Sequence, residues 1–76
     1  MKKPNIVMTV IKEDVGFSAV AKLKDIYIAT QGDDMDELKK NIVDAVNLAL
    51  EDKGIAYEIS EITLKSDLPS FFQFYK

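Results

Sequence analysis

The residues of this chain with the clearest potential for chemistry are four neighbouring carboxylates, Asp33, Asp34, Asp36 and Glu37. Carboxylate oxygens suit Mg²⁺ and Ca²⁺, but a calcium-binding loop needs a longer run of alternating ligands with a glycine inside it. The spacing fits a helix start, because Asp34 can accept a hydrogen bond from a free backbone N–H group while Glu37 reaches back. The four charges also oppose the positive end of a helix dipole. We therefore predict a structural cap made by Asp34 and Glu37, and no metal site.

Other residues that usually carry catalysis are missing. The chain contains neither histidine nor cysteine, so it lacks the usual general base, the commonest metal ligand and any reactive thiolate. It also has no glycine-rich phosphate-binding loop and no Ser/His/Asp set. We predict that the protein is not an enzyme and has no catalytic, cofactor-binding or metal-binding residues.

Charge and length narrow the class of protein further. All ten basic residues are lysines and the net charge is −3, which argues against direct nucleic-acid binding because arginine is the usual reader of phosphate and base edges. Seventy-six residues make a single domain. The sequence has no signal-peptide pattern and no apolar run of the roughly 20 residues that span a bilayer. We expect a cytoplasmic protein without membrane contact.

The elements that must position these residues follow from the hydrophobic pattern. Apolar residues alternate over residues 5–12, 17–23 and 26–31, which predicts a three-stranded antiparallel meander. Beyond the Asp34 cap, Leu38, Ile42, Ala45, Val46 and Ala49 recur at helical spacing, with Lys39, Lys40, Asn41, Asp44 and Asn47 largely on the opposite side. The helix should end near residues 52–53, where Gly54 can adopt the left-handed conformation.

A fourth strand is predicted to start at Ile59 or Glu61 and to run to Lys65, at an edge of the sheet. Because a crossover within one sheet is right-handed, this strand should lie parallel to strand one. The predicted fold is therefore α+β, in the order β-β-β-α-β, with one long helix on one face. A single helix leaves the other face bare, where Val7, Ile11, Val20 and Tyr27 would expose apolar surface. We therefore expect a homo-oligomer.

The last ten residues, "DLPSFFQFYK", concentrate four of the seven aromatic side chains. Asp67 and Pro69 suit the start of a helix, and Leu68, Phe71, Phe72 and Tyr75 fall on one face of it. We expect a domain over residues 1–66, followed over residues 67–76 by a short aromatic helix or linker toward a missing C-terminal domain. The aromatic residues that could contact a partner or another copy are Phe17, Tyr27, Phe71, Phe72, Phe74 and Tyr75. For Phe17 a place in the core is favoured, because buried aromatic residues usually belong to the core.

Residues 10–50 resemble the amino-terminal domain of HicB-like antitoxins, most clearly in "KEDVGFSA" and "TQGDDMDELKKNIVDAVNLAL". Members of that family start the helix with T-x-G-D-[ST]-x-x-E and carry asparagine and alanine at set positions within it. Asp34 stands where they have a serine or threonine cap, which is chemically equivalent. In place of their Pro-Asp-Leu-Pro-Gly-Cys-like loop, this chain has "KLKDIYIA". The matching positions are Thr30, Gly32, Asp33, Glu37, Asn41 and Ala45.

The resemblance implies a partial ribonuclease H-like fold and a role in a type II toxin–antitoxin system. Such domains bind a small RNA-cleaving toxin and cover its active surface by protein–protein contact. Ribonuclease H chemistry itself needs two metal ions held by carboxylates, and residues 5–12 contain none, so we predict no nuclease activity. The alternatives are an orphan regulatory or oligomerisation module without a toxin and, more weakly, a small-ligand-binding domain.

Overall fold

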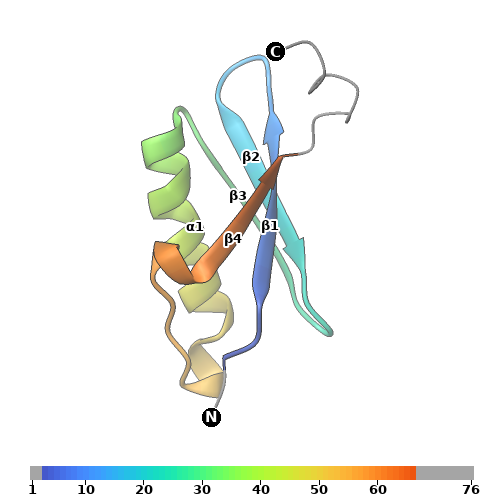
Figure 1. Ribbon diagram of the computed structural model, residues 1–76, viewed down its shortest axis with the longest axis vertical. Coiled ribbons are helices and arrows are strands. Elements are labelled where there is room, and N and C mark those ends of the chain that lie inside the picture. The colour runs from blue at the N-terminus through green and yellow to red at the C-terminus, as the bar shows by residue number, and fades with distance from the viewer. Residues whose placement is uncertain (1–2, 67–76) are drawn as a thin grey trace.

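The computed structural model of the chain describes residues 3–66, which form a four-stranded sheet with one long helix on one side (Figure 1). The strand order is β3-β2-β1-β4, with β1–β2 and β2–β3 antiparallel and β1–β4 parallel. The elements are β1 Ile6–Lys12, β2 Phe17–Lys22, β3 Tyr27–Gly32, α1 Met35–Ala49, the 3₁₀ turns η1 Glu51–Lys53 and η2 Ile59–Glu61, and β4 Ile62–Ser66.

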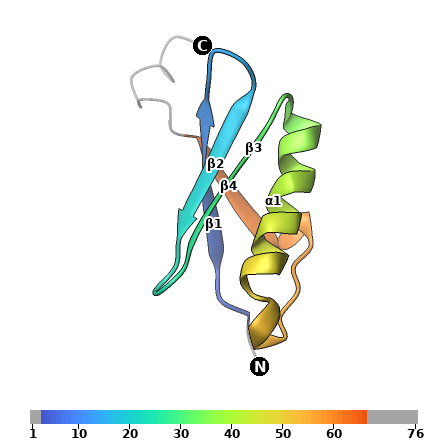
Figure 2. The ribbon, with the colours of Figure 1, turned by 180° about the vertical axis from the view of Figure 1, so that it is seen from behind.

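This architecture confirms the predicted α+β order, the antiparallel meander and an edge strand parallel to the first one. The helix leaves the end of β3 and the chain returns at the far edge of the sheet, so β4 pairs with β1 rather than with β3 (Figures 1 and 2). The short aromatic helix predicted over residues 67–76, and the start of a second domain there, lie outside the described residues.

The core lies between α1 and the inner face of the sheet. The period-two pattern directs Ile6, Met8 and Ile28 inward, and the period-3.6 pattern brings Leu38, Ile42 and Val46 onto them. Ala45 and Ala49 pack at the margin of this core. The buried hydrophobic residues are Ile6, Met8, Ala19, Ala21, Ile28, Leu38, Ile42, Val46, Leu50, Tyr57 and Ile62.

Two predicted boundaries differ from the structure. The helix ends at Ala49 after fifteen residues, earlier than predicted, and the chain tightens into the 3₁₀ turn η1. Gly54 does adopt the left-handed conformation, with φ 68°, but it ends η1 rather than α1. Both starts considered for the fourth strand, Ile59 and Glu61, lie within η2, and β4 runs from Ile62 to Ser66 instead of ending at Lys65.

The polar side predicted for the helix is also partly wrong. Lys39, Lys40 and Asp44 are exposed as expected, whereas Asn41 and Asn47 are half-buried. Both asparagines hydrogen-bond to backbone groups of neighbouring segments, and these contacts join α1 to the rest of the fold.

Candidate protein-binding surface

The residues that carry the family resemblance meet at the joint between β3 and α1. Gly32, the last residue of β3, lies directly under the first turn of the helix. A Cβ atom placed on it would be 2.5 Å from the backbone nitrogen of Leu38 and 2.7 Å from its Cα atom. Because both neighbours are backbone atoms, a side chain at position 32 would push the helix away from the strand.

The predicted helix cap is present at this joint. The Asp34 Oδ1 atom accepts a hydrogen bond from the Glu37 backbone N–H at 2.8 Å. Glu37 reaches back, but its Oε1 atom accepts from the backbone N–H of Asp33, at 2.6 Å, rather than from that of the cap residue. Two backbone donors at the start of the helix are thereby satisfied.

The asparagine of the motif completes the joint. The Asn41 side-chain amide donates to the carbonyl oxygen of Gln31 at 2.7 Å, tying the second turn of α1 to the end of β3. Thr30 is half-buried on the inner face of β3, and Ala45 is half-buried on α1 against the core. The motif positions therefore fix the angle between strand and helix, and their roles in these contacts are structural.

A second joint, which the sequence analysis missed, holds the other end of α1. The Asn47 side chain makes two hydrogen bonds with the backbone of Tyr57. Its Oδ1 atom accepts from the Tyr57 N–H at 2.7 Å, and its Nδ2 atom donates to the Tyr57 carbonyl oxygen at 3.1 Å. The Tyr57 hydroxyl donates to the Pro4 carbonyl at 2.6 Å. An asparagine inside a helix is a weak helix former, and this was the one feature that could have drawn attention to position 47.

Lys3 and Glu61 form a salt bridge at this end of the molecule. The Lys3 ammonium lies 2.9 Å from the Glu61 carboxylate and 5.2 Å from the centre of the Tyr57 ring. The hydrogen bond from Lys3, together with one from the Glu58 backbone N–H, lowers the pKa of Glu61 below its ordinary value of 4.5. The pair is exposed, so it orients the start of β1 more than it stabilises the fold.

The face of the sheet that points away from α1 carries exposed apolar side chains, and we call it the outer face. Among residues 3–66, no helix or loop covers it (Figures 1 and 2). The register aligns Lys65, Thr9, Val20 and Ala29 in one row across all four strands. The outer face consists of Val7, Thr9, Ile11, Ser18, Val20, Lys22, Tyr27, Ala29, Gln31, Thr63 and Lys65.

Large apolar side chains are exposed on this face. Tyr27 is 66% exposed and Val7 45% exposed. Val20 and Ile11 are half-buried, and they lie in the next rows of the sheet toward its other end. Thr9 and Ala29 have short side chains that project little from the sheet. This part of the outer face therefore suits packing against another flat surface.

The two aromatic contacts proposed within the described residues lie on opposite faces. Tyr27 is on the outer face and exposed. Phe17 is on the inner face and half-buried against the core, with the Lys12 ammonium 5.0 Å from the centre of its ring. Phe17 is therefore part of the inner layer and not of the outer face. Phe71, Phe72, Phe74 and Tyr75 lie outside the described residues.

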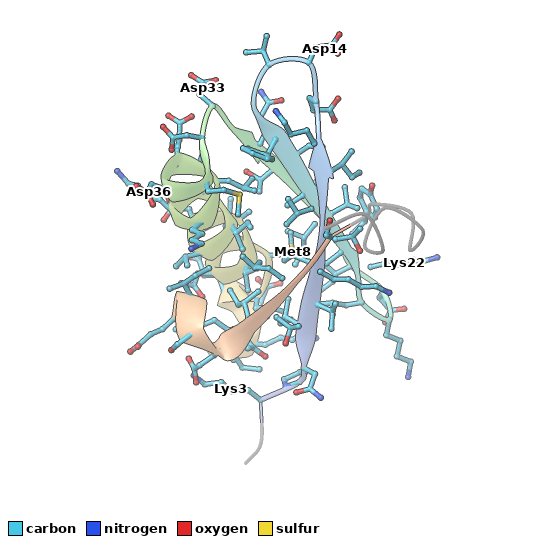
Figure 3. The ribbon with its side chains drawn as sticks, turned by 45° about the horizontal axis from the view of Figure 1, so that its top comes forward. Lys3, Met8, Asp14, Lys22, Asp33 and Asp36 are labelled. Carbon is cyan, nitrogen blue, oxygen red and sulfur yellow. The ribbon has the colours of Figure 1, made fainter. Side chains whose placement is uncertain are left out.

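Negative charge gathers at one end of the sheet. The β1–β2 turn lies against the β3–α1 joint, since a Cβ on Gly16 would be 2.5 Å from the Gly32 carbonyl oxygen. This contact brings Glu13 and Asp14 beside the carboxylates that start the helix, and Figure 3 places Asp14, Asp33 and Asp36 at this end, with Lys3 and Lys22 toward the other. We call Glu13, Asp14, Asp33, Asp34, Asp36 and Glu37 the acidic end.

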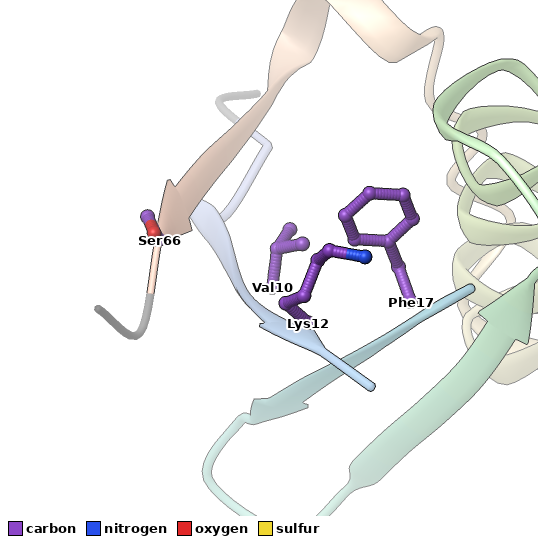
Figure 4. Close-up of a pocket in the computed structure, with 4 residues that line it drawn as sticks. All are labelled: Val10, Lys12, Phe17 and Ser66. Carbon is purple, nitrogen blue, oxygen red and sulfur yellow. The ribbon is translucent and has the colours of Figure 1, made fainter. Parts of the chain in front are cut away.

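Possible metal ligands and the hollows of residues 3–66 bear on whether this part of the chain could hold an ion or a small ligand. Within residues 3–66, no group of three or more acidic residues is arranged to hold a metal ion. A hollow lined by Pro4, Leu23, Ile26 and Leu50 lies beside the last turns of α1, with a volume of about 260 Å³. That volume is below the range typical of ligand pockets. Two other hollows reach this range, one of about 350 Å³ lined by Val10, Lys12, Phe17 and Ser66 (Figure 4) and one of about 400 Å³ lined by Ser18, Val20, Ala29, Thr30 and Gln31. No helix within residues 3–66 is long and apolar enough to cross a membrane.

Comparison of the chain with models of protein families, with curated proteins and with solved structures finds no match.

Proposed function

We propose that this chain is an antitoxin domain that binds a small RNA-cleaving toxin and occludes its active surface by protein–protein contact, without catalysis of its own. The observation that carries the proposal is the outer face, which no element of residues 3–66 covers and which exposes Val7 and, at one edge, Tyr27. An apolar surface of this kind is typical of a binding interface. The family resemblance supplies the kind of partner.

The negative charge of the chain also supports an RNA-cleaving toxin as the partner. A protein that cleaves RNA must attract a polyanion, so its active surface is expected to be basic. The acidic end places six carboxylates beside the β3–α1 joint, and the chain as a whole carries a net charge of −3. Opposite charges across the interface would speed association and favour one orientation over others.

Co-expression with the small basic protein encoded by the adjacent open reading frame tests this proposal. We expect a complex that survives purification, and rescue of the growth arrest that the toxin causes alone. The Tyr27→Ala variant should bind five- to thirtyfold more weakly, since an exposed aromatic anchor contributes about 1–2 kcal/mol to an interface. Leu48→Ala is the matched control, because Leu48 is similarly exposed, at 72%, but lies on the helix. The proposal is rejected if neither a complex nor a rescue of growth is observed.

The outer face also favours a second candidate, an orphan regulatory or oligomerisation module in which two copies pack outer face to outer face. Light scattering at high micromolar concentration distinguishes the two. A dimer that Val7→Lys dissociates, together with no toxin in the genomic neighbourhood, supports the module. A monomer at that concentration counts against it. A homo-oligomer is compatible with the antitoxin role as well.

The remaining expectations belong to the same proposal. A cytoplasmic location follows from the role, since the toxin's RNA substrates are there. The aromatic helix predicted for residues 67–76 lies outside the described residues and stays a prediction. The lack of enzymatic activity stays a prediction, and an assay of the purified chain for ribonuclease activity would check it.

A further inference from the structure

The β1–β2 turn carries an exposed apolar side chain next to two carboxylates. The backbone N–H of Glu13 donates to the Gly16 carbonyl at 3.0 Å, which leaves Asp14 and Val15 at the end of the turn. Val15 is 83% exposed, more than any other large apolar side chain of residues 3–66. The Glu13 carboxylate accepts a hydrogen bond from the Ser18 hydroxyl at 2.8 Å, so it is held beside the turn. We call Glu13, Asp14 and Val15 the acidic tip.

The hollow of about 260 Å³ beside the last turns of α1 has the complementary chemistry. Its apolar lining comes from the buried Leu50 and the half-buried Leu23 and Ile26, and from Pro4. The hollow is too small for a typical ligand, but it has room for one short branched side chain.

The charged residues that line the hollow are mainly basic. Lys24 and Lys53 are exposed ammonium groups on two sides of it, from the β2–β3 turn and from η1, and Asp25 supplies one carboxylate. The carboxylates next to Lys53 in sequence, Glu51 and Asp52, are not among the lining residues. An apolar side chain flanked by carboxylates therefore matches this hollow in both polarity and charge.

The acidic tip and the hollow lie at opposite ends of the molecule. Figure 1 shows the β1–β2 turn at one end of the sheet and the β2–β3 turn, with the end of α1, at the other. Figure 3 places Asp14 at the first end and Lys22, the last residue of β2, toward the second. The six residues of β2 separate the two turns by about 20 Å. A chain therefore cannot insert the acidic tip into its own hollow, whereas a second copy can.

We propose that copies of this chain associate head to tail, with Val15 of one copy seated in the hollow of the next. Glu13 and Asp14 of the first copy then face Lys24 and Lys53 of the second. Because the two surfaces differ, each copy both inserts and receives, and the contact is heterologous rather than two-fold symmetric. This inference goes beyond toxin binding, and it differs from the dimer that packs outer face to outer face.

Paramagnetic NMR on mixed copies of the full chain tests the proposal. The chain contains no cysteine, so Lys12→Cys provides a single site for a spin label directly before the acidic tip. Spin-labelled copies without ¹⁵N are mixed with ¹⁵N-labelled copies at about 1 mM, because small interfaces are weak. We expect line broadening between molecules at the amides of Leu23, Lys24, Ile26 and Lys53. Broadening confined to the outer face, or no broadening between molecules, overturns the proposal.

Valine substitutions separate the two modes of association. Val15→Ser, introduced into the spin-labelled copy, should weaken the association about tenfold, as expected when one buried valine is lost, and should reduce the broadening at the hollow. Val7→Ser is the matched control, since Val7 is an exposed valine on the outer face. It should leave the broadening unchanged. An equal loss from Val7→Ser, or no loss from Val15→Ser, rejects the head-to-tail contact.

Charge reversal gives an independent check. Lys24→Glu combined with Lys53→Glu, in the ¹⁵N-labelled copy, should remove most of the broadening at the hollow. Lys39→Glu combined with Lys40→Glu changes the net charge equally on exposed positions of α1 and should not. Equal effects of the two pairs would mean that net charge alone governs association and would overturn the proposal. The sample contains no toxin, so this proposal and the antitoxin role can each fail alone.

Discussion

Gly32 offers the most direct check of how strand and helix are joined. A Gly32→Ala change places a methyl group 2.5 Å from the Leu38 backbone nitrogen, and ordinary contact begins at 3.4 Å. The two atoms would have to separate by about 0.9 Å, from 2.5 Å to 3.4 Å. No side-chain rotation can relieve the contact, because both neighbours are backbone atoms. The start of α1 must therefore move, although the Leu38 side chain there is completely buried.

The size of the effect follows from the cost of overpacking. Forcing such a shift in a well-packed core costs about 1–3 kcal/mol, and the position of Gly32 against rigid backbone favours the upper half of that range. A chain of this length has a total stability of about 4–11 kcal/mol. With a urea dependence of about 1 kcal/mol per molar, a loss of 2 kcal/mol lowers the midpoint of unfolding by about 2 M.

Urea unfolding followed by far-UV circular dichroism measures this loss. Gly54→Ala is the matched control, because it has a φ of 68° and nothing within 4 Å of an added Cβ, so it tests backbone strain without crowding. We expect a loss of about 1 kcal/mol there, and less for Gly54→Asn, since asparagine tolerates the left-handed conformation. The reasoning is refuted if Gly32→Ala costs no more than Gly54→Ala.

Three further predictions concern the opposite end of the molecule. Asn47→Ala should lower the free energy of unfolding by about 2 kcal/mol, because it leaves the Tyr57 N–H without its partner, and equal stability in urea would contradict this. Tyr57→Phe should cost about 1 kcal/mol, since it deletes only the hydrogen bond to the Pro4 carbonyl; thermal unfolding measures it, and a loss as large as that of Asn47→Ala would argue against this ranking. The pKa of Glu61 is lowered in the folded chain by the hydrogen bond from Lys3, so its contribution to stability is present above pH 4.5 and is lost as the pH falls through the folded-state value. Glu61→Gln should therefore flatten the decline of stability on the acid side of pH 4.5, and superimposable pH profiles for the two proteins would show that the pair contributes nothing.

The sequence by itself determined the elements and their order. The alternation of apolar residues placed three strands, the period of 3.6 placed the helix, and the Asp34–Glu37 spacing marked where the helix begins. These are local properties, because the side-chain direction and the backbone donors involved lie within one or two turns of the same segment. For the same reason the left-handed conformation of Gly54 was predictable.

Contacts between distant segments were decided only by the tertiary structure. The Tyr57 hydroxyl meets the Pro4 carbonyl across 53 positions, and Asn47 meets the Tyr57 backbone across ten. No local pattern encodes such pairings. An asparagine in a helix is predicted to lie on the exposed polar side, and its partner becomes known only from the packing of another segment beside the helix. The end of α1 at Ala49 was likewise not predictable from the spacing, since the buried Leu50 still continues the four-residue period of Ile42 and Val46.

Some features of the candidate surface were likewise predictable from the sequence, and others were not. The sequence predicted that a single helix would leave one sheet face bare, and named Val7, Ile11, Val20 and Tyr27 on it. It listed both Phe17 and Tyr27 as possible partner contacts while favouring the core for Phe17, and the paired register directs the two side chains to opposite faces of the sheet. It also gave no reason for the glycine at position 32 beyond its place in a motif. The physical reason is the 2.5 Å approach of the helix backbone, a distance that exists only once β3 and α1 have packed.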